Sequence, residues 1–138
     1  MSEEQAQQLM YQMQMLENYF VELSRKEESL ISIIQEAAAA IESIKSIDKK
    51  SESTLFPLGL GAFVKTNISS DDKLILNIGS GVAVEKDKES AINFIEARLK
   101  EMQVALSDTE NQKQQVMANL EQGKYEMNRL MQAARNKK

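Results

Sequence analysis

The sequence contains no cysteine and no histidine, and these absences remove much of the chemistry that enzymes and metal sites use. Without cysteine, disulfide bonds and thiolate metal sites are excluded. Without histidine, the commonest general base and metal ligand is missing as well. We therefore expect no catalytic residue, no metal site and no cofactor.

Aromatic and turn-forming residues are also scarce. The 138-residue chain has no tryptophan, four phenylalanines, three tyrosines, five glycines and one proline. So few large aromatic side chains disfavour a thick globular core, and the length is that of one domain. The sequence shows neither a signal peptide nor an apolar run long enough to span a membrane, which predicts a cytoplasmic protein without membrane contact.

Positive charge is too sparse for a nucleic-acid partner. The chain has 17 lysines and arginines against 21 acidic residues, which gives a net charge of −4. Phosphate contacts require clustered cations, so a helical hairpin that docks on RNA is disfavoured. The one basic cluster, Arg135, Lys137 and Lys138, lies where cations favourably meet the dipole at a helix C-terminus.

A heptad pattern in the first third of the chain is the strongest positive signal. Apolar residues recur at alternating spacings of four and three, and Glu27 is the one polar residue among them. A straight α-helix drifts by about 20° per heptad against such a pattern, so its persistence indicates a coiled coil. The seam consists of Leu9, Met13, Leu16, Phe20, Leu23, Glu27, Leu30, Ile34, Ala37, Ile41 and Ile44.

A second seam lies in the last third, within a helix expected at Lys88–Asn136 with Asp87 as its N-cap. Thr109, Lys113 and Gly123 interrupt this seam. Gly123 is expected to weaken the helix by on the order of 1 kcal/mol relative to alanine. In an antiparallel pair, Glu27 and Lys113 would lie one turn apart. They would either pair and fix the register or extend separately to water. The seam consists of Ile92, Ile95, Leu99, Met102, Leu106, Thr109, Lys113, Val116, Leu120, Gly123, Met127, Leu130 and Ala134.

Between the two seams, the pattern changes from helical to β. Polar residues 48–53 predict a linker, and alternating apolar residues separated by glycine turns then predict two hairpins. Hairpins this small are marginal in water, and their edges favour pairing with other strands. The expected strands are Thr54–Phe56, Ala62–Ile68, Leu74–Ile78 and Val82–Glu85.

The glycine pairs and the adjacent carboxylates have ordinary explanations. Gly59 and Gly61, like Gly79 and Gly81, are followed by strand-like residues rather than by a helix, so hairpin turns are favoured over phosphate-binding loops. Asp71 and Asp72 follow two serines, which is typical of a turn rather than of a metal site.

These features predict an α+β fold. A long antiparallel two-helix coiled coil is joined at one end by two small β-hairpins, which assemble into an intersubunit β-barrel. The expected organisation is an N-terminal coiled-coil helix at 1–47, an oligomerisation region at 48–86 and a C-terminal coiled-coil helix at 87–138.

Several central segments resemble those of the α-class prefoldin subunit, either archaeal or eukaryotic. The layout of a helix, two hairpins and a second helix of equal length is similar as well, whereas the β class carries one hairpin. The segments that carry the resemblance are Pro57–Val64 (PLGLGAFV), Ile78–Val82 (IGSGV), Val84–Asp87 (VEKD) and Ala91-Ile92.

The resemblance implies an ATP-independent chaperone rather than an enzyme. It implies a hetero-hexamer of two α-class and four β-class subunits, with six arms that project from a β platform. The arm ends would hold non-native polypeptides and deliver them to a group II chaperonin without nucleotide. The alternative is a coiled-coil scaffold or tether that oligomerises through its β region.

Two sets of residues are candidates for these roles. Methionine suits surfaces that accept many sequences, and five of the eight methionines lie near the expected arm tips. Ordinary surface scatter is the alternative explanation, since Ile31, Ile33 and Val104 are also apolar residues off the seam. The expected client-binding residues are Leu9, Met10, Tyr11, Met13, Met15, Tyr125, Met127, Leu130 and Met131. The expected oligomerisation residues are Phe63, Val64, Ile68, Leu74, Leu76, Ile78, Val82 and Val84.

Overall fold

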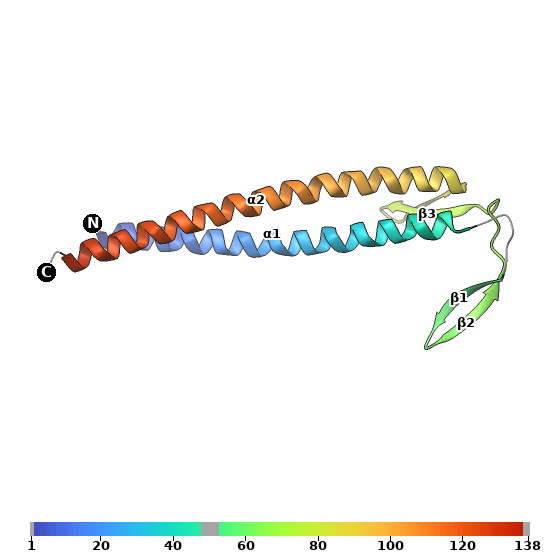
Figure 1. The fold of residues 1–138 in the computed structure, drawn as a ribbon, viewed down its shortest axis with the longest axis horizontal. Helices are drawn as coiled ribbons and strands as arrows, with labels where there is room; N and C mark the ends of the chain where they lie inside the picture. Colours follow the sequence, from blue (N-terminus) through green and yellow to red (C-terminus); the bar gives the residue numbers. More distant parts are fainter. Residues whose placement is uncertain (1, 48–52, 137–138) are drawn as a thin grey trace. The chain divides into compact units, whose positions relative to one another are not determined.

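The computed structural model describes residues 2–47 and 53–136, and it contains two long helices and two β-hairpins (Figure 1). This order confirms the expected architecture of a helix, two hairpins and a helix. The predicted linker at residues 48–53 lies mostly outside the described residues. In chain order the elements are α1 (Ser2–Lys45), β1 (Thr54–Gly59), β2 (Ala62–Thr66), β3 (Leu74–Gly79), β4 (Val82–Lys86) and α2 (Lys88–Asn136).

The chain forms two compact units. The arm unit comprises Met1–Ser32 and Gln103–Lys138, and the hairpin unit comprises Ile33–Met102. Each helix contributes to both units. The three-region division expected from the sequence follows the element boundaries instead, and it stays a prediction.

In the arm unit the two helices lie side by side and antiparallel. Two contacts show this arrangement: Met13 lies against Gly123, and Glu27 lies against Lys113. The seam residues face the partner helix, as the heptads predict. Leu23 and Val116 are only 4% and 5% exposed. All residues of the first seam are buried or half-buried, and Ala134 is the one exposed residue of the second.

The hairpin unit contains both hairpins, and each has the same tight turn. β1 pairs with β2 and β3 pairs with β4, both antiparallel. The two-residue turns Leu60-Gly61 and Ser80-Gly81 have positive φ at both positions, the geometry that matches the twist of paired strands. Each turn follows a glycine that also has positive φ.

The two hairpins repeat each other twenty residues apart. Adding 20 to each residue number in the first hairpin gives the pairing of the second: Thr54↔Thr66 becomes Leu74↔Lys86, and Gly59↔Ala62 becomes Gly79↔Val82. An irregularity of register also recurs, one residue before Gly59 and one before Gly79. The hairpins are therefore two copies of one structural unit.

The bounds of five elements differ from the sequence-based expectation. β1, β3 and β4 end later than predicted, at Gly59, Gly79 and Lys86 rather than at Phe56, Ile78 and Glu85. α1 ends at Lys45 rather than at Ile47, while α2 has the expected bounds. β2 ends at Thr66, so Ile68 lies in the connection rather than in the strand, and it is half-buried there. Within the described residues, neither helix is apolar enough over sufficient length to cross a membrane.

Candidate functional site

The predicted client-binding residues separate into two groups. Leu9, Met13, Met127 and Leu130 are half-buried seam residues. The side chains of the other five are between 54% and 68% exposed. These five lie off the seam, near the N-terminal end of α1 and the C-terminal end of α2. These five, Met10, Tyr11, Met15, Tyr125 and Met131, are called the arm-end set below.

Other exposed apolar side chains occur along the helices. Ile31, Ile33 and Val104 are exposed, as their outer heptad positions predict. Further exposed residues in the arm unit, which the sequence reasoning left out, are Tyr19, Val21 and Met117. Their positions off the heptad seam were the signal that could have found them.

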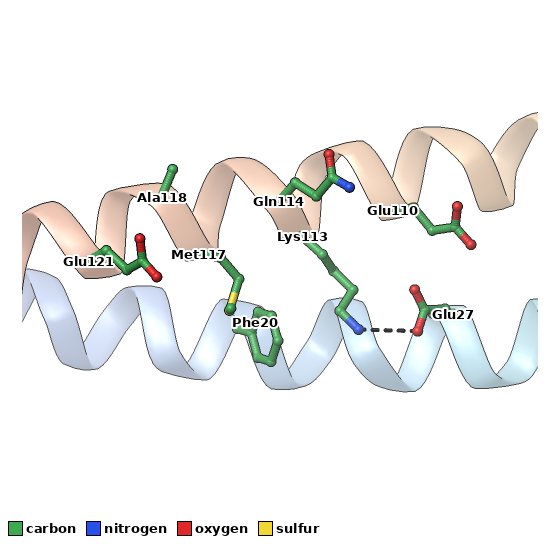
Figure 2. Close-up of a pocket in the computed structure, with 8 residues that line it drawn as sticks. All are labelled: Phe20, Glu27, Glu110, Lys113, Gln114, Met117, Ala118 and Glu121. Atoms are coloured by element: carbon green, nitrogen blue, oxygen red, sulfur yellow. Dashed lines mark hydrogen bonds and ion pairs between the residues drawn. The ribbon is translucent and has the colours of Figure 1, made fainter.

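A polar layer crosses the seam in the arm unit. The Lys113 Nζ lies 3.1 Å from the Glu27 Oε1 and 5.0 Å from the centre of the Phe20 ring. Figure 2 shows this pair beside a groove whose apolar lining includes Phe20 and Met117. Of the two arrangements that the sequence left open for Glu27 and Lys113, the structure has the paired one.

The two other interruptions of the second seam are also accommodated by packing. Thr109 is 1% exposed, and its hydroxyl donates a hydrogen bond of 2.8 Å to the Ala105 carbonyl. A Cβ on Gly123 would lie 3.0 Å from the Met13 Cγ, so the glycine makes room for that side chain. Gly123 therefore offsets part of its low helix propensity by allowing close packing.

The predicted oligomerisation residues remain largely accessible in the single chain. Phe63, Val64, Ile78 and Val82 are exposed, whereas Leu74, Leu76 and Val84 are half-buried. The first hairpin is the more open of the two, because every residue of β1 is exposed. Exposed apolar strands of this kind favour burial against other strands.

The two helix ends in the hairpin unit are joined through Lys88. Its Nζ donates hydrogen bonds to the carbonyls of Lys45 and Ile47, which satisfies acceptors at the end of α1. Asp87 caps α2, as predicted, by accepting a hydrogen bond from the Ser90 backbone N–H. That hydrogen bond, assisted by the Ser90 hydroxyl and by nearby Lys73 and Lys86, lowers the pKa of Asp87.

The second hairpin also contacts α2. Two cations lie near the Phe94 ring, with the Lys86 Nζ 5.8 Å and the Arg98 guanidinium 5.5 Å from its centre. The Arg98 guanidinium donates a 3.5 Å hydrogen bond to the Ile78 carbonyl. These contacts tie β3 and β4 to the first turns of α2.

The carboxylates of the connection between the hairpins form a turn. Asp72 accepts a hydrogen bond of 2.8 Å from the Ser69 backbone N–H, and the Asp71 N–H donates to the Ser69 hydroxyl. The turn that the sequence predicted here is confirmed. Among the described residues, no group of three or more acidic side chains is arranged to hold a metal ion.

Paired helices with a closed seam, joined through two hairpins with open apolar faces, define a coiled-coil assembly subunit. The family model of the prefoldin subunit matches residues 13–133. The prefoldin subunit alpha of Nitrosopumilus maritimus is 60% identical over 134 residues, which are 96% of this chain and 92% of that protein.

Two solved structures share the fold. The prefoldin beta subunit from Thermococcus strain KS-1 has a TM-score of 0.63 at 15% identity, covering 89% of either chain. The filamentous PFD from Methanocaldococcus jannaschii has a TM-score of 0.55 at 22% identity, covering 90% of this chain and 98% of that one.

The chain therefore belongs to the prefoldin family. It is an α-class subunit, as its central motifs predict, and the identity of 60% to a prefoldin subunit alpha carries that assignment. Prefoldins are chaperones without enzymatic activity, so the predictions of a chaperone subunit and of no enzyme are confirmed.

Proposed function

We propose that this subunit holds non-native polypeptides with the arm-end set and delivers them to a group II chaperonin in the cytoplasm. It acts within a hetero-hexamer of two α-class and four β-class subunits, without nucleotide. The observation that carries the proposal is the exposure of the arm-end set, between 54% and 68%, on helices whose seam is already closed.

The arm-end side chains suit weak and tolerant binding. The flexible, polarizable thioethers of Met10, Met15 and Met131 adapt to different partners, and Tyr11 and Tyr125 add aromatic faces. One arm would bind weakly. Several arms around one client would bind far more tightly, because each further contact is intramolecular.

The hairpins supply the means of bringing several arms together. Their exposed apolar strands would be buried in a β-barrel completed by strands from other chains. A scaffold or tether would also need such assembly, but it has no use for exposed apolar side chains near the helix ends. The arm-end set therefore favours the chaperone over the tether.

The first experiment removes the arm ends from the assembled complex. Deleting Met1–Leu16 and Glu121–Lys138 should leave assembly with β-class subunits intact, because the assembly residues lie in the hairpins. Suppression of aggregation of a denatured client, followed by light scattering, should be lost. A truncated hexamer that holds the client as well as wild type would place binding elsewhere on the chain.

The second experiment changes side chains only. Replacing the arm-end set with serine should weaken client holding while the seam stays intact. The matched control replaces Ile31, Ile33 and Val104 with serine, which removes exposed apolar side chains away from the helix ends. Equal losses in the two variants would mean that general surface hydrophobicity, and not the arm ends, carries the binding.

A further inference from the structure

One flank of the arm unit has a groove in which side-chain amides are the commonest lining residues. Two adjoining hollows between α1 and α2 share Leu16 and Asn119, and together they are called the amide groove. Its apolar lining includes Leu9, Met13 and Val116. Of the described residues that line it, only Glu126 is charged. The amides are Gln12, Asn111, Gln112, Gln115, Asn119 and Gln122.

The other flank of the same helix pair differs in charge. Its groove is lined by three glutamates and a lysine around Phe20 and Met117 (Figure 2). In a heptad, the positions on the two sides of the seam face opposite flanks of the helix pair. At these grooves, the arm is therefore charged on one flank and nearly neutral on the other.

Neutral amides complement a polypeptide main chain. Each carboxamide offers two N–H donors and a carbonyl acceptor, and all six amides of the groove are exposed. An extended, unfolded segment presents main-chain N–H and C=O groups that need partners. With one charged lining residue, the groove offers little electrostatic attraction to a strongly charged ligand.

We propose that this amide groove binds an extended, uncharged segment of non-native polypeptide. Gln12, Asn119 and Gln122 hydrogen-bond the main chain of the segment, and Met13 and Leu16 contact its apolar side chains. The inference rests on the proposed chaperone function and adds the chemistry of what is recognised. The recognition depends on the main chain, so it tolerates many sequences.

The size of the groove sets the length of the bound segment. From Leu9 to Tyr19, α1 rises by about 15 Å at 1.5 Å per residue. An extended chain advances about 3.3 Å per residue, so the groove accommodates roughly five residues. A peptide of seven residues therefore covers it with its ends free.

The test uses the complex assembled with β-class subunits and two labelled probes. One is a heptapeptide of alternating leucine and serine, and the other is the same peptide with alternate main-chain nitrogens methylated. Methylation removes donors without adding charge. By fluorescence anisotropy, the wild-type complex should bind the unmethylated peptide about tenfold more tightly, the effect of one or two hydrogen bonds.

The variant with Gln12→Met, Asn119→Leu and Gln122→Met keeps apolar contact and helix propensity but removes the amides. It should bind both peptides equally. The matched control, Gln114→Met, changes an amide that lines the charged flank and should keep the tenfold preference. If the triple variant does not assemble, Gln12→Glu alone should favour a peptide with lysine in place of serine, in a salt-dependent manner.

Equal binding of the two peptides by wild type, or no binding of either, would overturn the inference, as would a triple variant that keeps the preference. Suppression of client aggregation by the same wild-type complex separates the two proposals. If aggregation is suppressed without any preference between the peptides, the amide groove is wrong and the chaperone function stands. If aggregation is not suppressed, the chaperone function itself fails.

Discussion

The helix pair buries its apolar seam residues, whereas the hairpins leave most of their apolar side chains exposed. Leu23 and Val116 in the arm seam are 4% and 5% exposed, whereas Phe56 and Phe63 in the first hairpin are 55% and 57% exposed. Two helices can close a seam within one chain, since each needs only one apolar stripe covered. A two-stranded hairpin has two faces and two open edges, so it requires further strands. The chain thus carries one self-sufficient part and one that depends on partners.

The largest effect is expected from a charge introduced into the hairpins, the part that depends on partner chains. Val64→Asp or Leu76→Asp should abolish the complex with β-class subunits, because an unpaired charge in a buried interface costs several kcal/mol. Helicity should persist, because the arm seam does not use these residues. Analytical ultracentrifugation and circular dichroism measure the two effects.

The control for that experiment is Ser80→Asp, which adds the same charge in an exposed turn. Ser80 has a φ of 53°, a conformation that aspartate tolerates. Assembly should be unchanged. A Val64→Asp chain that still assembles would show that this face of the first hairpin is not in the interface.

A smaller effect tests how tightly the arm closes its seam. Gly123→Leu should destabilise the helix pair by about 1–3 kcal/mol, because the added side chain meets Met13. Adding Met13→Ala should recover much of that loss by restoring space. Thermal melts of the full-length chain, followed by helicity, give the comparison. A double variant no more stable than Gly123→Leu alone would show that the two residues do not share one space.

A weaker effect is expected from the polar layer. Glu27 and Lys113 are about one-fifth exposed, at 23% and 20% of their side-chain surface, so solvent screens their attraction. A double-mutant cycle with Glu27→Leu and Lys113→Leu should give a coupling of about 0.2–1 kcal/mol that falls with added salt. The doubly substituted chain should not be less stable than wild type, because two leucines close the seam. A coupling energy of zero at low salt would mean that the ion pair does not help to fix the register of the two helices in solution.

The smallest effect concerns the cap of α2 and depends on pH. The Ser90 hydrogen bond holds the pKa of Asp87 below its ordinary value of 3.8. The folded state thus favours the charged carboxylate, whose stabilisation is present above that value and is lost as pH falls through the lowered pKa. Asp87→Asn keeps an acceptor but does not titrate. Its deficit in thermal stability relative to wild type should shrink below about pH 4. A deficit independent of pH would contradict this assignment.

Sequence reasoning predicted the helices, hairpins and seams because each depends on a local period. It also placed Asp87 as a cap, since capping uses residues that are neighbours in the chain. It considered only the low helix propensity of Gly123 and missed its close packing. The Met13 side chain that packs against this glycine comes from the other helix. The amide groove was missed for the same reason, although an uncharged stretch from Gln5 to Leu16 was a visible signal.

The sequence by itself determined which residues form elements and which face of each helix is apolar, because both follow from spacing along one chain. It left open whether Glu27 and Lys113 pair, and only the tertiary structure decided that. Their 3.1 Å contact depends on the register between two helices, which the packing of Met13 against Gly123 helps to set. The sequence also could not show that amides from α1 and α2 share one groove. Residues far apart in the chain become neighbours only when the helices pack.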